Sequence, residues 1–286
     1  MMSQNFLSTL TGSFAQPAME NPTGVVMEAA FKHHQLNWRY INCEIAPASL
    51  KEAVAGAKAM QWRGFNCSIP HKINIIEHLD GLGQSAKIIG AVNTVINNNG
   101  KLIGENTDGR GFVESIKDTI DPADKHIVLF GAGGAARAVA VELALAGAKQ
   151  LTIVNRSIEK AQDLCDLIEQ HTSAAASPVA WENTYSIPST THLVINATSI
   201  GLYPDVDATL DIDTTSITSN MVVADGIFNP PQTQLIQSAN ANGCKTVPGI
   251  GMLVQQGAIA FEYWTGIKPN IEVMEKALRE ALEIAD

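Results

Sequence analysis

Positive charge is scarce in this chain. Its 19 Lys and Arg residues stand against 29 Asp and Glu residues, which gives a formal net charge of −10 at pH 7. Nucleic acids and membrane surfaces attract proteins that carry a basic face, so we expect neither as a partner. Any phosphate that the protein binds must therefore meet a small local group of cations.

Cysteine is also rare, and long uninterrupted apolar runs are missing. The four cysteines lie far apart without a CxxC pair, which predicts isolated reduced thiols and no metal site. The most apolar stretch, residues 130–148, is interrupted by Arg137 and Glu142 and is not expected to cross a membrane. The first residues carry neither the basic nor the apolar segment of a secretory signal. We therefore expect a cytoplasmic protein that needs no metal.

The 286 residues, 45% of them hydrophobic, suffice for two domains with separate cores. Near the N-terminus, strand-like runs at residues 38–42 and 64–68 flank an amphipathic helix at 48–60. Two short apolar runs around the turn at 97–100 predict a hairpin. This order predicts a small α/β domain with a mainly parallel sheet.

A second pattern begins after residue 107. Glycines bracket the start of a helix there, and from His126 the chain alternates strand, glycine turn, helix and strand. Such alternation predicts an open, doubly wound Rossmann-type sheet. Residues 173–177 are interpreted as a short loop. The predicted organisation is an N-terminal α/β domain (1–108), a nucleotide-binding domain (109–248) and C-terminal helices (249–286).

A glycine-rich turn follows the apolar strand at 126–130 and leads into a helix. Its sequence has the form G-x-G-x-x-A in the strand–turn–helix setting that dinucleotide-binding domains use. The first glycine permits a tight turn, the second lets the backbone approach a pyrophosphate, and the helix N-terminus offers N–H groups. The cofactor-binding residues predicted here are Gly131, Ala132, Gly133, Gly134 and Ala135. The alternative is a tight turn that binds no nucleotide.

The end of the next strand, at 151–154, indicates which nucleotide binds. NAD enzymes usually place a carboxylate there, whereas this chain has Asn155, Arg156 and Ser157, with Lys160 a turn later. Cations and a hydroxyl favour a ribose 2′-phosphate, so the predicted cofactor is NADP. Ser157 also suits the N-cap of the helix that follows, and the two roles are compatible.

Polar residues collect at the ends of predicted strands in the first domain. They occur in the segments N-C-S-I-P-H-K at 66–72, G-A-V-N-T at 90–94 and N-T-D at 106–108. Lys72 could exchange a proton with a carbonyl oxygen, and Asp108 could pair with it or with substrate hydroxyls. Further polar contacts are expected from Asn66, Ser68 and Asn93.

Each of these residues also has an ordinary structural interpretation. A lone lysine is usually a surface charge, Asp108 suits a helix N-terminus, and Asn93 suits a turn. His71 neighbours Lys72 and is a rival acid or base; we interpret it as an ordinary exposed histidine.

Taken together, these segments resemble the shikimate dehydrogenase family over nearly the whole chain. The segments that carry the resemblance are N-C-S-I-P-H-K at 66–72, G-A-V-N-T at 90–94, N-T-D-G at 106–109, the nucleotide loop at 131–136, N-R-S at 155–157, N-A-T-S-I-G-L at 196–202 and G-M-L-V-Q-Q at 251–256. So many segments in one order are specific to this family, and a generic Rossmann domain would not carry them.

The resemblance implies an NADP-dependent, reversible reduction of 3-dehydroshikimate to shikimate, in a fold whose C-terminal helix returns to the N-terminal domain. Lys72 would transfer the proton or stabilise the alkoxide, and Asp108 would orient the lysine and the substrate. The substrate-binding residues that it implies are Asn21, Thr23, Ser68, Asn93 and Gln256. Gly226 and Gly249 would belong to the cofactor site. The partner would be a shikimate-like cyclic acid, and the protein would act as a monomer or homodimer.

Two regions depart from the family pattern. The family normally has two serines that hold the substrate carboxylate, where this chain has Met19 and Asn21 with Glu20 between them, and Phe228 replaces a common tyrosine. Each hydrogen bond lost to a charged ligand costs about 1.5–3 kcal/mol. Two alternatives therefore stay open. One is a related enzyme that oxidises quinate or another cyclic polyol acid analogue, and the other is a non-catalytic nucleotide or ligand sensor on the same fold.

Overall fold

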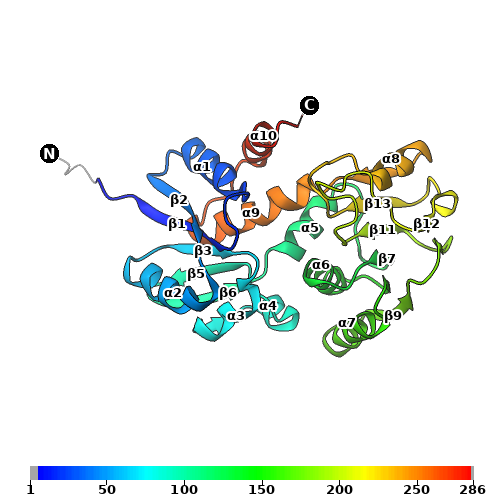
Figure 1. The fold of residues 1–286 in the computed structure, drawn as a ribbon, viewed down its shortest axis with the longest axis horizontal. Helices are drawn as coiled ribbons and strands as arrows, with labels where there is room; N and C mark the ends of the chain where they lie inside the picture. The colour runs from blue at the N-terminus through cyan, green and yellow to red at the C-terminus, as the bar shows by residue number, and fades with distance from the viewer. Residues whose placement is uncertain (1–5, 285–286) are drawn as a thin grey trace. The chain divides into compact units, whose positions relative to one another are not determined.

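A computed structural model describes residues 6–284 of the chain, which fold into two compact units. Unit 1 is the chain up to Thr107 together with the chain from Gly257 onward, and unit 2 is Asp108–Gln256. In Figure 1, unit 1 is coloured blue to cyan with an orange-to-red end, and unit 2 is green to orange. Residues 249–256, which the sequence analysis grouped with the C-terminal helices, lie in unit 2.

Unit 1 is built on a six-stranded sheet with the order β2-β1-β3-β5-β6-β4. Its strands are β1 (Thr9–Ala15), β2 (Trp38–Glu44), β3 (Gly64–Cys67), β4 (Gly81–Leu82), β5 (Thr94–Asn98) and β6 (Lys101–Glu105). Three of its five pairings are parallel and two are antiparallel, so the sheet is mixed with a parallel majority. The antiparallel part comes from the predicted hairpin, whose turn places Asn99 at φ 53° and Gly100 at φ 89°.

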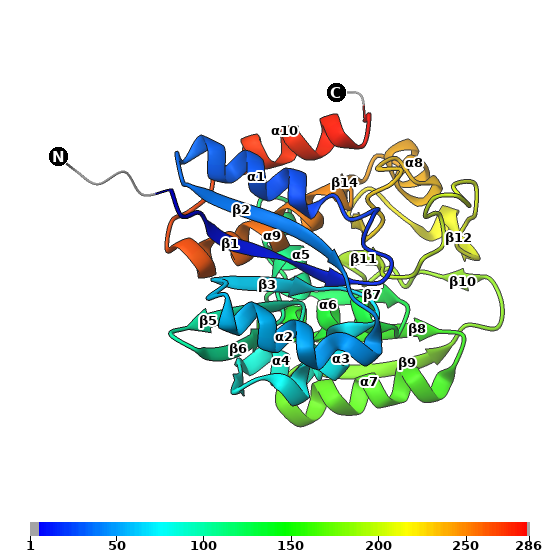
Figure 2. The same cartoon turned by 60° about the vertical axis from the view of Figure 1, so that its left-hand side comes forward.

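Helices cover both faces of this sheet. They are α1 (Thr23–His33), α2 (Leu50–Ala59), α3 (His71–Asn74), α4 (Gln84–Ile89), the last turns of α9 (Ile250–Thr265) and α10 (Ile271–Ala281), with short 3₁₀ turns at Pro47–Ser49 and Ile75–His78. Trp264, buried at the end of α9, donates its indole N–H to the carbonyl oxygen of Val95 at 3.0 Å. α10 then packs along α1, as Figure 2 shows. The final helices of the chain therefore complete the core of unit 1.

Unit 2 contains an all-parallel six-stranded sheet with the order β14-β13-β11-β7-β8-β9. Its strands are β7 (His126–Phe130), β8 (Gln150–Asn155), β9 (Ala175–Ala180), β11 (Leu193–Asn196), β13 (Val222–Asp225) and β14 (Lys245–Val247). A small pair, β10 (Tyr185–Ser186) and β12 (Ile212–Asp213), lies beside it, and a 3₁₀ turn follows at Thr214–Ser216. This is the doubly wound sheet that the sequence predicted.

The interpretation of residues 173–177 as a loop was wrong for residues 175–177. Residues from Ala175 form β9, an edge strand that pairs with β8 along its whole length. Small and polar residues and Pro178 weaken the strand signal in the sequence. An edge strand tolerates them because one side of its backbone needs no partner.

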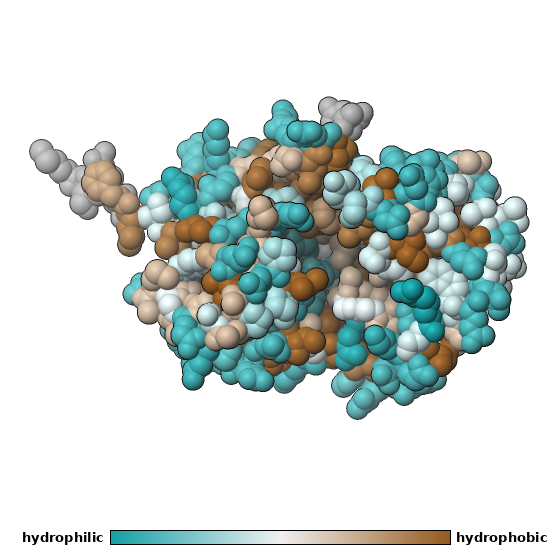
Figure 3. Space-filling view, viewed as in Figure 1, coloured by the Kyte–Doolittle hydropathy of each residue, from teal (hydrophilic) through white to brown (hydrophobic). Residues whose placement is uncertain are grey.

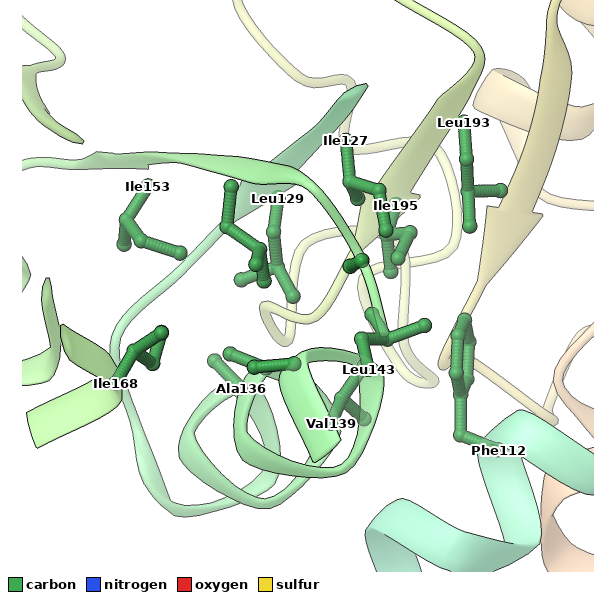
Figure 4. Packing of buried hydrophobic residues seen from close by; sticks show 14 of the residues in the cluster. Phe112, Ile127, Leu129, Ala136, Val139, Leu143, Ile153, Ile168, Leu193 and Ile195 are labelled. Carbon is green, nitrogen blue, oxygen red and sulfur yellow. The ribbon is translucent and has the colours of Figure 1, made fainter. Parts of the chain in front are cut away.

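The helices of unit 2 pack on this sheet through a dense apolar core. They are α5 (Asp108–Ile116), α6 (Gly134–Leu145), α7 (Ile158–His171), α8 (Gln234–Ala241) and the first turns of α9. In Figure 4, Ala136, Val139 and Leu143 of α6 lie against strand residues such as Leu129 and Ile195, and all of them are buried. The core holds the glycine turn and α6 rigidly against the end of β7.

The hydrophilic surface and the free thiols are what the composition predicts. The face that Figure 3 shows is mostly hydrophilic over α7 and α8. All four cysteines are free thiols; Cys67, Cys165 and Cys244 are buried and Cys43 is half-buried. Among residues 6–284, no helix combines the length and the apolar run that a membrane crossing requires.

Candidate active site

The turn after β3 carries two of the predicted site residues, Ser68 and Lys72. The Ser68 amide donates to the Phe14 carbonyl at 3.0 Å, and the His71 amide donates to the Ser68 carbonyl at 2.8 Å. The carbonyl of Lys72 accepts from the Val92 amide at 2.8 Å. Both site side chains are half-buried. The backbone bonds fix the turn, so the hydroxyl and the ammonium leave it from set positions in unit 1.

His71 is not the exposed histidine that the sequence analysis expected. Its side chain is fully buried, and its Nε2 lies 2.8 Å from the carbonyl oxygen of Ile45. A carbonyl only accepts, so Nε2 carries a proton and donates it to Ile45. Nδ1 has no hydrogen-bond partner among the described residues. The first residue of α3 turns inward to anchor the turn, which leaves Lys72 as the titratable residue of this segment for exchange with a substrate.

Asn93 is held by the last residue of unit 1 before the chain enters unit 2, Thr107. The Asn93 Oδ1 accepts from the Thr107 amide at 2.7 Å, and its Nδ2 donates to the Thr107 Oγ1 at 3.0 Å. Asn66 donates to the Asn93 carbonyl at 3.1 Å and accepts from the Tyr40 hydroxyl at 2.8 Å. All of these residues are buried. Neither Thr107 nor Tyr40 is predicted from the sequence, although Thr107 directly precedes the predicted Asp108.

Asn21 lies in a second cluster of polar side chains, at the ends of β1 and β2. Its Nδ2 donates to the Ser13 Oγ at 3.2 Å, and its Oδ1 accepts from the Thr23 amide at 3.0 Å. Ser13 donates to the Asn42 Oδ1 at 2.9 Å, and Asn42 donates back to the Asn21 carbonyl at 2.9 Å. Met19 is 86% exposed nearby in the chain. The sequence analysis missed Ser13 and Asn42, which no motif marks.

The glycine turn of unit 2 has the geometry of a pyrophosphate cradle. Gly131 has φ 108°, and a Cβ there would lie 2.9 Å from the Ala197 carbonyl oxygen, so only glycine fits. At Gly133 and Gly134 a Cβ would meet nothing within 4 Å, and no side chain caps the start of α6. The N-terminal N–H groups of a 12-residue helix therefore face open space, which suits an anionic ligand.

Two cations, Arg156 and Lys160, and one carboxylate, Glu159, follow the end of β8. Asn155 donates to the Ser157 carbonyl at 2.8 Å, and Ser157 accepts from the Lys160 amide at 3.3 Å as the N-cap of α7. Arg156 and Lys160 are exposed. Ser157 also donates to Glu159 at 2.8 Å, which the sequence analysis missed. A backbone hydrogen bond and then the Ser157 hydroxyl hold the pKa of Glu159 below its usual value. Two cations against one carboxylate still favour a 2′-phosphate here.

Asp108 and Gln256 lie on neighbouring helices of unit 2. Asp108 is the half-buried first residue of α5, and Gln256 is buried in α9 with its Nε2 donating to the Leu253 carbonyl at 3.1 Å. A Cβ on Gly111 would lie 2.6 Å from the Gln256 backbone nitrogen, so glycine is what allows α5 to approach α9. Lys72 and Asp108 belong to different units.

A small cavity of about 50 Å³ lies in unit 2 beside the glycine turn. Its wall includes Ala135 and Val139 of α6, Asn196 at the end of β11, Gly226 after β13, and Met252 of α9. Gly226 donates its amide to the Asn196 carbonyl at 2.8 Å, and a Cβ on Gly249 would lie 2.3 Å from the Ile227 carbonyl oxygen. The predicted cofactor residues Ala135 and Gly226 thus border one cavity, and Gly249 packs behind it. Phe228, two residues after Gly226, is half-buried.

No group of three or more His, Cys, Asp or Glu side chains in the described part of the chain is arranged to hold a metal ion. The arrangement instead combines one lysine with hydroxyl and amide groups in unit 1, and a nucleotide-type cradle in unit 2. That combination suits proton exchange at a polar carbonyl compound with a dinucleotide as second reactant.

Comparison with known sequences identifies the family. Residues 14–95 match the shikimate dehydrogenase substrate binding domain, residues 113–203 match shikimate / quinate 5-dehydrogenase, and residues 249–279 match the shikimate 5′-dehydrogenase C-terminal domain. The chain belongs to the shikimate dehydrogenase family. The family, the two α/β sheets and the Rossmann-type second unit that the sequence predicted are therefore confirmed.

Members of this family resemble the chain over nearly its full length. The shikimate dehydrogenase (NADP(+)) of Alkaliphilus oremlandii is 41% identical over 273 residues, which cover 94% of this chain and 96% of that protein. The ligand-free 5-ketofructose reductase of Gluconobacter sp. strain CHM43 is 50% identical, with a TM-score of 0.95, covering 97% of this chain and all of that one. The shikimate 5-dehydrogenase of Thermus thermophilus, in complex with NADP(H) and shikimate, is 30% identical with a TM-score of 0.84, covering 96% and 99%.

Proposed function

We propose that the protein is an enzyme that catalyses the reversible, NADP-dependent reduction of 3-dehydroshikimate to shikimate. The observation that carries this proposal is the turn after β3, which sets Ser68 and Lys72 at one strand end beside the Val92–Asn93 backbone of the same unit. The near-complete coverage at 41% identity to a protein named shikimate dehydrogenase (NADP(+)) supports it.

The proposed roles follow from the chemistry of each side chain. The ammonium of Lys72 donates a proton to the substrate carbonyl oxygen during reduction, and in the reverse direction the neutral amine accepts one from the alcohol. Asp108 orients the lysine and a substrate hydroxyl. The remaining hydroxyls are bound by Ser68, Asn93 and Gln256, with Asn21 and Thr23 at the far end of the substrate. The bound nucleotide supplies or takes up the hydride.

The proposed cofactor site uses the residues of unit 2. Gly131–Ala135 and the start of α6 bind the pyrophosphate with backbone N–H groups, and Arg156, Ser157 and Lys160 bind the 2′-phosphate beside Asn155. Gly226 and Gly249 leave room for the nicotinamide ring. The open space at Gly133 and the uncapped start of α6 fit this group.

A second substrate class is favoured by the cluster around Asn21. Both functional groups of the Asn21 amide are already engaged by Ser13 and the Thr23 amide, and Met19 offers no hydrogen bond. Met19 and Asn21 therefore do not supply the two hydroxyls that the family pattern normally has at these positions. The 50% identity to a 5-ketofructose reductase points the same way. The second candidate is thus a neutral polyhydroxy ketone such as 5-ketofructose.

A steady-state assay at 340 nm tests the proposal. Purified protein is offered NADPH or NADH with 3-dehydroshikimate or 5-ketofructose, and NADP⁺ or NAD⁺ with shikimate, quinate or fructose. Rapid turnover of the shikimate pair with NADP(H) supports the first candidate, and turnover of 5-ketofructose alone replaces it with the second. Absence of turnover with all of them, while NADPH still binds, overturns the enzymatic proposal and leaves a ligand sensor.

We also propose that the enzyme works in the cytoplasm as a monomer or homodimer on this small-molecule substrate. Size-exclusion chromatography with light scattering tests the assembly, and a tetramer or larger would contradict it.

A further inference from the structure

Asp225 is a deeply buried carboxylate without a cationic partner. It ends β13, opposite Asn196 on β11, and its side chain is 1% exposed. Its carboxylate accepts hydrogen bonds from the Thr233 hydroxyl at 2.6 Å, the Ile227 amide at 2.9 Å and the Asn196 Nδ2 at 3.0 Å. No ion pair to it occurs within residues 6–284. Its negative charge is therefore solvated by neutral donors alone.

This charge lies directly behind the wall of the unit 2 cavity. Asn196, which donates to the carboxylate, and Gly226, the next residue in the chain, both line that cavity. Asn196 also accepts from the Thr198 amide at 3.0 Å and its hydroxyl at 2.7 Å, and Thr198 lines the same wall. The cavity is thus bordered by Asn196, which hydrogen-bonds to the buried anion, and by Gly226 and Thr198, which hydrogen-bond to Asn196.

A buried anion acts strongly on a charge that enters the space beside it, because the surrounding core screens poorly. The nicotinamide ring carries a positive charge when oxidised and none when reduced. Burial raises the pKa of Asp225 to about 6, against the three hydrogen bonds that lower it, so the group is ionised at pH 8. It therefore attracts the oxidised ring and is indifferent to the reduced one.

We propose that Asp225 sets the relative affinity of this protein for the two redox forms of the nucleotide, favouring NADP⁺ over NADPH. The proposal rests on the proposed function, which has the nicotinamide ring beside Gly226, the residue that follows β13. Asp225 acts through space and through Asn196 and is not itself a catalytic residue.

Isothermal titration calorimetry of NADP⁺ and of NADPH, each alone at pH 8, tests the proposal. In Asp225→Asn, the dissociation constant for NADP⁺ should rise about tenfold and that for NADPH less than threefold, by the Coulomb attraction lost. The matched control is Asp213→Asn, which removes the same charge from a half-buried N-cap of unit 2 and should leave the ratio unchanged. Equal weakening of both nucleotides in Asp225→Asn would overturn the proposal and show a purely structural role.

The wild-type protein supplies a second measurement in case Asp225→Asn does not fold. The ratio of the NADP⁺ to the NADPH dissociation constant should rise severalfold between pH 8 and pH 5, as Asp225 gains a proton; a constant ratio overturns the proposal. The 2′-phosphate is common to both nucleotides and cancels. The groups that contact Asp225 from β11, the following turn and α8 do not titrate, and Lys245 of β14 pairs with the opposite end of β13. Wild-type protein that binds neither nucleotide would instead overturn the proposed function.

Discussion

The two units hold the groups proposed to face ligands in different ways. In unit 1 these groups are side chains held by other side chains, as in the bonds between Asn93 and Thr107 and between Asn66 and Tyr40. In unit 2 the glycine turn presents backbone N–H groups, and no atom lies within 4 Å of the position that a Cβ on Gly133 would occupy.

This difference predicts which kind of mutation disrupts each unit. A buried side-chain network fails when one member is removed, because its partner is left unpaired at a cost of about 1–3 kcal/mol. A backbone cradle fails when an atom is added, because the ligand has to approach the main chain closely. Substitutions in the two units are therefore expected to act through different physical effects.

The largest effect is expected at Lys72, the proposed proton donor of unit 1. Lys72→Ala should lower kcat by about a thousandfold, the usual size of a general acid contribution. Affinity for NADPH, a property of unit 2, should stay the same in a fluorescence titration. Undiminished turnover would remove Lys72 from the proposed mechanism, and a protein without turnover before and after the change would be the ligand sensor.

Asp225 is an exception in unit 2, because its carboxylate belongs to a buried network of side chains. Its carboxyl has an ordinary pKa of 3.8 and a folded-state pKa of about 6, so between these values the native state holds more protons than the unfolded chain. The free energy of unfolding should therefore fall as pH rises from 4 to 6, by about 2 kcal/mol from this group.

Urea unfolding of the wild type and of Asp225→Asn at pH 4 and pH 7 isolates this contribution. The stability of the variant relative to the wild type should increase with pH. A difference that is the same at both pH values would show that the carboxyl titrates normally.

Gly133→Ala tests the backbone cradle of unit 2. The added methyl group meets no atom within 4 Å, so the melting temperature without ligand should not change. NADPH should bind roughly tenfold to a hundredfold more weakly, because the phosphate loses charge-assisted hydrogen bonds worth about 1.5–3 kcal/mol. Gly131→Ala is the contrasting variant: it strains the turn and should lower the melting temperature even without nucleotide. Normal NADPH binding by Gly133→Ala would argue against a pyrophosphate at this turn.

Arg156→Glu tests the exposed side chains at the end of β8. The KM for NADPH should rise about tenfold, as expected for a solvent-screened contact, while that for NADH changes little. Glu159→Gln is the opposite change at the same place and should lower the KM for NADPH. Equal effects on both nucleotides would exclude Arg156 from binding the 2′-phosphate.

The smallest effect is expected at Thr107. Thr107→Val removes the acceptor of the Asn93 Nδ2 and should destabilise the protein by about 1 kcal/mol and raise the substrate KM, whereas Thr107→Ser keeps the hydroxyl. Thermal unfolding and steady-state kinetics of the two variants provide the measurement. Identical behaviour of Val and Ser would show that the hydroxyl does not position Asn93.

Much of this fold could be predicted because local patterns carry it. The strand and glycine turn at 126–136, the hairpin around Asn99 and the helix at 48–60 each have a short-range physical signature. β9 was missed because an edge strand does not require the apolar alternation that identifies a strand. The parallel majority of the unit 1 sheet was predictable, and its antiparallel part followed from the hairpin.

The site was predictable where a motif marks it and not where distant residues meet. Ser68 and Lys72 stand in one segment, so their proximity is local. The neighbours of Asn21 are Ser13 and Asn42, which the sheet register brings together from β1 and β2. The burial of His71 depends on Ile45, 26 positions away in the chain. Such contacts are set by tertiary structure and have no signature in a single sequence.

The passage of α9 from one unit to the other has a consequence for synthesis on the ribosome. Asp108–Gln256 is contiguous, so all of unit 2 can emerge and fold while the chain is still growing. The first part of unit 1 is synthesised before unit 2, but unit 1 can complete its fold only after the segment from Gly257 onward has been synthesised. Until Trp264 appears, the Val95 carbonyl lacks its indole donor and α1 lacks α10. The nascent N-terminal sheet therefore lacks the cover of α9 and α10 during the whole synthesis of unit 2.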